Sequence, residues 1–369
     1  MREQDHIYTK SRRNFIRKTA LGTAAILSVS ASPAILRPNQ NKKMGIALVG
    51  LGYYSRDLLS PALLKTSETY LSGIVTGSSE KAKTWSEKYK IPEKNIYNYS
   101  NFDDIAFNDD IQIVYIVLPN SMHREYTIRA AAAGKHVICE KPMALNAEEC
   151  RDMIAACKDY KVKLSIGYRM HYEPNTQEIM KMGQEAEFGE VRQITGGAGF
   201  FMSNFTNWRM KQDMGGGAMM DMGVYPLNAA RYITGKEPDS VSAQEFNNRP
   251  DIFTEVDEII SFQLEFPGGV IANLITGFNA NYNHIRATAK KGWFGLDPFS
   301  SYGGIKGVSS KGPINFPEIN QQAKQMDEFA ISIKNDTPLR VTGDEGLKDM
   351  IVVDAIKESI AKNGKTIYL

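Results

Sequence analysis

The chain has 369 residues, of which 42% are hydrophobic and 23% are charged. These proportions are ordinary for a soluble globular protein and exclude a long disordered chain. At roughly 150 residues per domain, the length predicts two domains. The 44 basic and 42 acidic residues give a formal charge of +2. So small an excess does not indicate a polyanionic partner, and we expect no nucleic-acid ligand.

The first 34 residues have the pattern of an export signal. The twin arginines Arg12 and Arg13 precede an uncharged, mildly apolar run, Thr19–Ala31, which small residues follow. A basic region, an apolar region and a small-residue exit are typical of a secretory signal. We therefore predict that residues 1–34 are a twin-arginine signal peptide that directs the protein to the periplasm, without stable membrane insertion after processing. The alternatives are a tail with no targeting role and an uncleaved signal that anchors the chain.

Strand-like and helix-like segments alternate through residues 44–165. The predicted strands are Ile46–Val49, Tyr70–Val75, Ile113–Leu118, His136–Cys139 and Leu164–Ile166, and the predicted helices include Met122–Ala133 and Ala147–Tyr160. Such alternation predicts a doubly wound parallel sheet covered by helices, which is the α/β arrangement of a Rossmann domain.

Residues 166–369 have a stronger β pattern. The predicted strands are Val191–Phe201, Val241–Phe246, Ile259–Phe266, Val270–Phe278 and His284–Ala289, and a helix is predicted at Gln322–Ile333. The sequence Phe266-Pro267-Gly268-Gly269-Val270 is typical of a hairpin turn. We therefore expect an α+β domain with a mostly antiparallel, open sheet.

A glycine pattern follows the first predicted strand. Ile46–Val49 runs into Gly50-Leu51-Gly52-Tyr53-Tyr54-Ser55, a G-x-G-x-x-S sequence, and a helical stretch begins at Arg56. Two glycines in this place permit a tight turn and let a pyrophosphate approach backbone N–H groups at a helix N-terminus. Ser55, in place of a third glycine, is small enough to keep helix and strand close. The pattern predicts a dinucleotide site, with a plain strand–helix turn as the alternative.

The end of the second predicted strand bears on the choice of cofactor. That strand leads into Thr76-Gly77-Ser78-Ser79-Glu80-Lys81, where hydroxyls and a lysine stand in place of a carboxylate at the strand end. A site for NAD usually places a carboxylate there for the ribose hydroxyls, whereas hydroxyls with a lysine suit a 2′-phosphate. The segment favours NADP, although Glu80 and Lys81 could instead only solvate the next helix.

Two further groups of residues could carry chemistry. Lys141, in Cys139-Glu140-Lys141-Pro142, follows a predicted strand at the sheet edge where α/β proteins bind ligands, and an ammonium there could stabilise a developing alkoxide. Asp221 and Tyr225 are four residues apart and would project from one face of a helix. A tyrosine near an ammonium can exchange a proton with a substrate oxygen. Each residue could instead have a structural role only. Lys141 would then be a solvated side chain in a surface turn, Tyr225 a residue of an amphipathic helix and Asp221 the cap of that helix.

These motifs belong to a series of blocks that resembles the Gfo/Idh/MocA oxidoreductase family and, within it, the glucose–fructose oxidoreductase branch. The resemblance runs from Met44 to the C-terminus. Its blocks are Leu118–His123, Glu140–Pro142, Ile166–Tyr172, Trp208–Arg209, Gly215–Tyr225 and Arg231–Tyr232. The broader family commonly has histidine where Tyr225 stands, whereas the glucose–fructose branch has tyrosine.

The resemblance implies a catalytic set of Lys141, Asp221 and Tyr225, with Tyr225 as the proton donor and acceptor. It implies a tightly bound NADP rather than NAD, a small sugar as substrate and a homo-oligomer, dimer or tetramer. The second domain would bind substrate and form the subunit contact, and its last helices would pack against the first domain. No metal site is predicted. The residues assigned to the cofactor are Gly50, Leu51, Gly52, Tyr53, Thr76, Lys81, Tyr99, Leu118, Pro119, Asn120, His123, Glu140, Lys141, Arg169, Trp208 and Arg209.

The sequence therefore predicts an NADP-dependent oxidoreductase that transfers hydride between the cofactor and a sugar or polyol. Two alternatives stay open: an NAD-dependent glycosidase that works by transient oxidation and elimination, and a non-catalytic sugar-binding protein. The segments Gly199–Asn207 and Asp297–Pro317 do not match the family pattern well. Both are expected to be loops on the substrate side, so the sequence leaves the identity of the sugar open.

Overall fold

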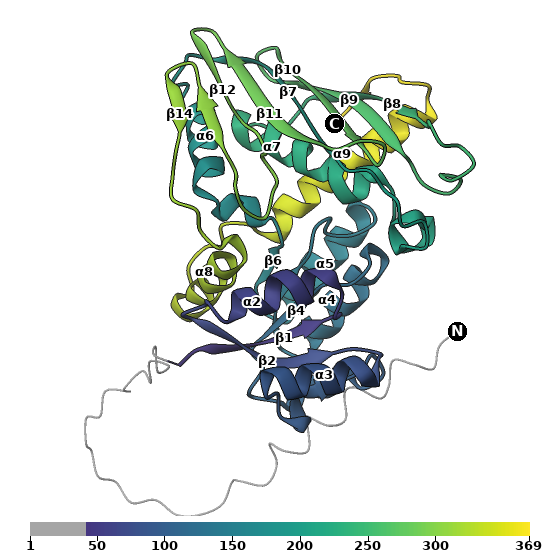
Figure 1. The fold of residues 1–369 in the computed structure, drawn as a ribbon, viewed down its shortest axis with the longest axis vertical. Coiled ribbons are helices and arrows are strands. Elements are labelled where there is room, and N and C mark those ends of the chain that lie inside the picture. Colours follow the sequence, from purple (N-terminus) through teal and green to yellow (C-terminus); the bar gives the residue numbers. More distant parts are fainter. Residues whose placement is uncertain (1–41) are drawn as a thin grey trace, which may run out of the picture. The chain divides into compact units, whose positions relative to one another are not determined.

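The computed structural model describes residues 42–369 (Figure 1). The predicted signal peptide, residues 1–34, lies outside the described residues. Within 42–369, no helix has both the length and the apolar character needed to cross a bilayer.

The first sheet has six parallel strands in the order β3-β2-β1-β4-β5-β6. The strands are β1 Met44–Val49, β2 Thr69–Val75, β3 Ile96–Tyr97, β4 Ile113–Ile116, β5 His136–Cys139 and β6 Leu164–Ile166. This order is the one expected of a doubly wound dinucleotide-binding sheet, and it confirms the predicted fold class. Successive side chains of β1 enter two different cores, because alternate residues of a strand face opposite sides of the sheet: Ile46 and Leu48 pack in one, Ala47 and Val49 in the other.

Helices cover both faces of this sheet. The π-helical turn η1 (Tyr54–Leu59) and α2 (Ser60–Leu63) follow β1, and α3 (Ser79–Tyr89), α4 (His123–Ala132) and α5 (Ala147–Asp159) follow β2, β4 and β5 in turn. Helix α8 (Gln321–Asn335) returns from the far end of the chain to lie beside α2 (Figure 1). Its Met326 and Phe329 pack in the same core as Ile46 and Leu48 of β1. The end of the chain thus helps to cover the first sheet.

The second sheet has nine strands in the order β14-β13-β12-β11-β7-β10-β9-β8-β15. All neighbouring pairs are antiparallel except β7 with β10, which are parallel. The bounds are β7 Val191–Gly199, β8 Ser240–Phe246, β9 Ile259–Phe266, β10 Val270–Gly277, β11 Tyr282–Ala289, β12 Gly292–Leu296, β13 Gly307–Ser309, β14 Gly312–Ile314 and β15 Ile367–Tyr368. The predicted mostly antiparallel sheet is confirmed.

One face of the second sheet carries helices α6 (Pro174–Gln184), α7 (Val224–Thr234) and α9 (Gly343–Ala361) (Figure 1). Along β10, side chains alternate between buried and exposed, as expected of a sheet with one covered face and one open face.

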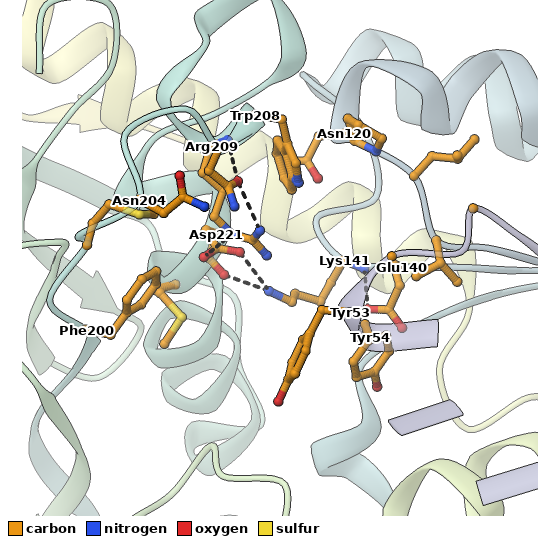
Figure 2. A pocket seen from close by; sticks show the side chains of 18 of the residues that line it. Tyr53, Tyr54, Asn120, Glu140, Lys141, Phe200, Asn204, Trp208, Arg209 and Asp221 are labelled. Carbon is orange, nitrogen blue, oxygen red and sulfur yellow. Dashed lines mark hydrogen bonds and ion pairs between the residues drawn. The ribbon is translucent and has the colours of Figure 1, made fainter. Parts of the chain in front are cut away.

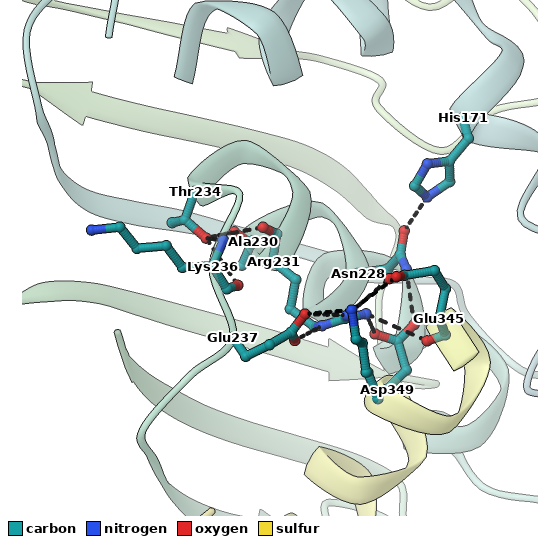
Figure 3. Close-up of polar contacts among 10 residues, drawn as sticks. His171, Asn228, Ala230, Arg231, Thr234, Lys236, Glu237, Glu345 and Asp349 are labelled. Atoms are coloured by element: carbon teal, nitrogen blue, oxygen red, sulfur yellow. Dashed lines mark hydrogen bonds and ion pairs between the residues drawn. The ribbon is translucent and has the colours of Figure 1, made fainter. Parts of the chain in front are cut away.

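A cluster of charged and polar side chains joins α7 to α9 (Figure 3). Arg231 and Asp349, exposed by 2% and 0%, form an ion pair, and Arg231 also pairs with Glu237 at 2.6 Å. Asn228 donates to Asp349 at 2.9 Å and contacts Nε2 of His171 at 2.8 Å. Burial lowers the pKa of His171 to about 4, so this imidazole is neutral at ordinary pH. The cluster therefore fixes α7 against α9 and against the turn that contains His171.

Candidate active site

A cavity of about 940 Å³ lies between the first sheet and the second domain (Figure 2). Loops at the carboxyl ends of β1, β2, β4 and β5 line one side, which is where open α/β sheets bind ligands. Segments of the second domain line the other side, among them Phe200–Asn204, Trp208–Arg209 and Ser300–Tyr302. The volume is at the upper end of the range of small-molecule pockets, roughly 300–1,000 Å³.

The loop after β1 has the geometry that its glycines predict. Gly50 has φ +91°, and a Cβ there would meet the carbonyl oxygen of Val117. At Gly52, no described atom lies within 4 Å of the position that a Cβ would take, so a ligand can reach the backbone. Ser55 donates to the carbonyl of Gly50 at 2.6 Å and closes the turn. The serine thus supplies a hydrogen bond where the usual pattern has a third glycine.

The loop after β2 brings hydroxyls and a lysine to the cavity. Thr76 and Lys81 line it, together with Tyr99, whose ring lies against Gly77. The hydroxyl of Ser78 accepts the backbone N–H of Lys81 at 3.2 Å and so begins helix α3 beside the cavity. A helix N-terminus with a lysine in its first turn is suited to hold a phosphate.

The loops after β4 and β5 line the centre of the cavity. Leu118, Pro119 and Asn120 come from the first loop, and Asn120 donates to the carbonyl of Gly215 at 2.7 Å, which ties this loop to the second domain. Glu140 accepts a hydrogen bond from Tyr115 at 2.7 Å. Burial raises the pKa of Glu140, while Tyr115 and Lys141 oppose that effect.

Lys141, Asp221 and Tyr225 meet in the cavity (Figure 2 shows the first two). The ammonium of Lys141 lies 2.7 Å from the backbone carbonyl of Asp221, 3.9 Å from its carboxylate and 4.3 Å from the ring centre of Tyr225. Arg209 pairs with the Asp221 carboxylate at 2.7 Å. Burial alone would raise the pKa of Asp221, but Arg209 and Lys141 outweigh it and lower that pKa. Asp221 is therefore an anion that holds two cations beside Tyr225.

A π-helical turn, η8 (Met219–Gly223), carries Asp221 and leads directly into α7, which carries Tyr225. Asp257, from the loop before β9, accepts the N–H of Met219 at 2.7 Å and caps this turn. Gly217 has φ +105°, and a Cβ there would collide with the Asp257 carboxylate. Gly217 is therefore required by the close approach of this cap, whereas at Gly216 a Cβ would meet the carbonyl of Arg209.

Arg169 stands behind Tyr225. Its side chain is buried, and it donates to the carbonyls of Ser300 and Ser301 at 2.5 and 2.8 Å. Its guanidinium carbon lies 5.7 Å from the ring centre of Tyr225 and 4.4 Å from that of Tyr302. A fixed cation is thus placed between two tyrosine rings at one end of the cavity.

All but one of the residues predicted for the site line this cavity. The exception is His123, which we expected at the cofactor. Its imidazole is fully buried, and its two ring nitrogens lie 2.9 and 3.0 Å from the carbonyls of Pro142 and Leu118. Burial lowers its pKa, so His123 is a neutral residue that joins the loops after β4 and β5 from beneath the cavity.

The cavity wall also contains residues that the motifs did not single out. They are Tyr54, Val117, Phe200, Phe201, Met202, Ser203, Asn204, Asn207, Met222, Asn283, Ser300, Ser301 and Tyr302. The only sequence signal for most of them was the mismatch of Gly199–Asn207 and Asp297–Pro317 with the family pattern. Both segments do lie at the cavity.

Residues 44–168 match the family model described as "Oxidoreductase family, NAD-binding Rossmann fold", and residues 176–294 match that of the GFO/IDH/MocA C-terminal domain. The chain belongs to the Gfo/Idh/MocA oxidoreductase family. It is therefore an oxidoreductase with a domain built to bind a nicotinamide dinucleotide.

Proteins with assigned activities are similar over most of the chain. An aldose–aldose oxidoreductase from Caulobacter crescentus, solved with glycerol, is 42% identical, with a TM-score of 0.86 over 89% of this chain and 100% of that one. A D-xylose 1-dehydrogenase (NADP(+)) of Haloarcula marismortui is 29% identical over 324 residues, which are 85% of this chain and 90% of the relative. A myo-inositol 2-dehydrogenase from Lactobacillus plantarum, 22% identical with a TM-score of 0.76, shares the fold.

Proposed function

We propose that this protein is an NADP-dependent oxidoreductase that interconverts a sugar carbinol and the corresponding carbonyl. The proposal rests on one observation. Lys141, Asp221 and Tyr225 lie together in a cavity that the glycine loop after β1 also lines. A dinucleotide fits these residues, because Gly50 gives the tight turn against Val117 and Gly52 leaves the backbone open to a pyrophosphate. When bound, the nicotinamide supplies the hydride acceptor or donor.

The protein's own residues would move the proton and hold the substrate oxygen. In the oxidative direction, the Tyr225 oxygen acts as a phenolate and accepts the proton that leaves the substrate hydroxyl, and in the reductive direction the resulting phenol returns that proton. The Lys141 ammonium, near the Tyr225 ring, stabilises the negative charge that develops on the substrate oxygen. Asp221 fixes that ammonium through its carbonyl and its carboxylate. The three side chains thus have complementary roles in one proton transfer.

The preference for NADP rests on the loop after β2. Thr76 and Lys81 present a hydroxyl and an ammonium at the start of α3, where a ribose 2′-phosphate is expected. The NADP(+) in the name of the Haloarcula marismortui relative supports the same choice. We propose in addition that the cofactor is retained between turnovers, as in the branch that the sequence resembles.

A sugar as substrate agrees with the chemistry of the second-domain wall and with the relatives. Phe200 and Phe201 offer apolar ring faces, and Asn204 and Asn283 offer amides, which together suit a ligand with many hydroxyls and a C–H surface. The two relatives named above for aldose and D-xylose chemistry support the proposal.

Periplasmic export, proposed from Arg12 and Arg13, would deliver the folded enzyme with its cofactor. Cell fractionation of the wild type and of an Arg12→Lys, Arg13→Lys variant tests this proposal.

Mass spectrometry of the purified protein after denaturation tests the cofactor directly. The proposal expects NADP(H) to be released in near-stoichiometric amount. Release of NAD(H), or failure of the protein to bind added NADP(H), would count against it.

A further inference from the structure

The turn Phe299–Tyr302 walls the end of the cavity near Tyr225. Ser300, Ser301 and Tyr302 all line the cavity. The match to the family models ends at residue 294, so this wall belongs to a part of the chain that the shared pattern does not cover. A wall that lies outside the shared family pattern is where selectivity among substrates is expected.

Three separate elements hold the backbone of this turn. Asn283 of β11 accepts the N–H groups of Phe299 and Ser300 at 3.0 and 2.9 Å. Arg169 donates to the carbonyls of Ser300 and Ser301, and Gln321 of α8 donates to that of Ser301 at 3.2 Å. Because these bonds come from different directions, the turn is fixed in position and not only in conformation.

The Tyr302 ring is held on two sides. The guanidinium carbon of Arg169 lies 4.4 Å from its centre, and the ring of Tyr54, from the loop after β1, lies 5.7 Å away. Burial, followed by the proximity of Tyr225, raises the pKa of Tyr302, so its phenol is neutral at ordinary pH. Yet 44% of the residue remains exposed, and it lines the cavity. Tyr302 is thus a rigid, neutral surface beside the Tyr225 end of the site.

We propose that Tyr302 is a specificity-determining residue that limits the size of the sugar at the reaction end of the cavity. This inference rests on the proposed function. A larger sugar would need the ring to leave its contacts with Arg169 and Tyr54, and a fixed wall resists such overpacking. We expect the smaller sugar to react faster than a sugar with one more carbon by roughly 10- to 200-fold, which is the discrimination that one carbon gives in a pocket.

D-xylose and D-glucose are a matched pair of probes, because in their pyranose forms they differ only by a hydroxymethyl group. The measured quantity is the second-order rate constant for reduction of enzyme-bound NADP+ in a single turnover, expressed as the ratio of the D-glucose value to the D-xylose value. Tyr302→Ala removes the wall while the backbone carbonyls that anchor Arg169 remain. We expect this variant to raise the ratio roughly 10-fold or more. Because both sugars are assayed on one preparation, a loss of folded protein cancels in the ratio.

Three further variants complete the test. Tyr302→Phe keeps the ring and should keep the ratio within about twofold of wild type, whereas Tyr302→Leu should raise it by a smaller factor than Tyr302→Ala. Tyr160→Ala, at an exposed tyrosine after α5, controls for loss of an aromatic ring elsewhere. A ratio unchanged in Tyr302→Ala, with both sugars still turned over, overturns the role of Tyr302 alone. Failure of the wild type to oxidise both D-xylose and D-glucose overturns this inference, and failure with a full panel of aldoses and polyols overturns the proposed function as well.

Discussion

Tyr225 stands between two cations that reach it from different parts of the fold. Lys141, from the loop after β5, lies 4.3 Å from its ring centre, and Arg169, from the turn after β6, lies 5.7 Å away. Neither cation depends on Tyr225 for its own place, since Lys141 is held by Asp221 and Arg169 by Ser300 and Ser301. The Tyr225 hydroxyl can therefore be removed without displacing Lys141 or Arg169.

Replacing Tyr225 with phenylalanine tests its role in proton transfer. The ring and its packing stay, while the hydroxyl is lost. Loss of a general acid–base group lowers kcat by roughly 100- to 10,000-fold. Affinity for NADP, measured by fluorescence titration of the same variant, should stay near that of wild type. A Tyr225→Phe enzyme with full sugar turnover would show that another group moves the proton.

Lys81→Ala tests the preference for NADP. An ammonium bonded to a phosphate contributes about 1.5–3 kcal/mol, so NADP affinity should fall roughly 10- to 100-fold while NAD affinity changes little. Lys83, on the same helix and exposed, provides the matched control, and Lys83→Ala should leave both affinities unchanged. Calorimetric titration with each dinucleotide measures the difference. An equal loss for NAD and NADP in Lys81→Ala would place Lys81 away from the 2′-phosphate.

Single residues could be predicted from sequence where a motif fixes both type and place. Gly50 and Gly52 are of this kind, because only glycine gives such a turn and such access. His123 belongs to a recognised block, yet the sequence could not say which way its ring points, and it points into the protein. Tyr302 is part of no motif, and only its contacts with Arg169 and Tyr54 show its role.

At the scale of elements, the turn η8 depends on a capping carboxylate. Asp257 accepts the N–H of Met219 at the start of the turn that carries Asp221. Burial raises the pKa of Asp257 to about 6, and the charge of Glu245 acts in the same direction. Ionisation of the Asp257 carboxyl at neutral pH therefore lowers the stability of the folded protein.

The free energy of unfolding of the wild type should differ from that of Asp257→Asn by an amount that depends on pH. An unfolded aspartate has a pKa of about 3.9, so between about pH 4 and pH 6 the folded state binds the proton more tightly. The free energy of unfolding of the wild type, relative to Asp257→Asn, therefore falls as pH rises through this window. The amide oxygen still accepts the Met219 N–H. We expect the variant to be more stable at about pH 7.5 by on the order of 1–3 kcal/mol, and nearly equal at about pH 3.

Urea unfolding of both proteins at the two pH values measures this difference. Asp257→Ala serves as the comparison, since it also removes the acceptor and should be less stable than Asp257→Asn at both. A difference between wild type and Asp257→Asn that is the same at both pH values would mean that Asp257 does not titrate in this range.

Strands with a clear apolar pattern were predictable, including the three-residue β6, and strands of two residues were not. β5 and β9 have the predicted bounds because each is a continuous or alternating apolar run. β3 and β15 have two residues each, too few to show a period, and exist because they pair with β2 and β8. The helix predicted at Met122 begins at His123, after a short 3₁₀ turn. Spacing placed Asp221 and Tyr225 on one helix but could not reveal the π-helical turn between them.

At the scale of the whole molecule, the cluster around Arg231 joins the helix of Tyr225 to the end of the chain. Its partners Glu345 and Asp349 lie on α9, more than 110 residues away. Removing one member of a buried pair leaves the other charge uncompensated, which costs about 3–5 kcal/mol. We therefore expect Arg231→Met to lower the free energy of unfolding by about that amount, as measured by urea denaturation.

Arg192→Met is the matched control for Arg231→Met. Arg192 pairs with Glu190 at 3.0 Å, but both side chains are more than half exposed. Such surface pairs contribute about 0–1 kcal/mol, so its loss should be small. Equal effects of the two substitutions would show that the cluster does not hold α7 and α9 together.

The two-domain fold and the position of the cavity could be predicted, since motif order placed the dinucleotide loop in one domain and Asp221 with Tyr225 in the other. The return of α8 to the first sheet came only as an expectation from the family. It depends on a core that Met326 of α8 shares with Ile46 of β1, and residues so far apart in the chain leave no local pattern. The turn at Ser300 is held by Arg169, 131 residues earlier, and the sequence gives no sign of that bond.

The central claim is that a sugar reduces NADP+ bound in this cavity. A single-turnover experiment tests it: the protein is saturated with NADP+, mixed with an aldose, and followed by the near-ultraviolet absorbance of the reduced nicotinamide. We expect reduced nicotinamide to form in an amount close to that of the enzyme, and Tyr225→Phe to slow its formation at least 100-fold. Bound NADP+ that stays oxidised with a full panel of aldoses and polyols would contradict the account.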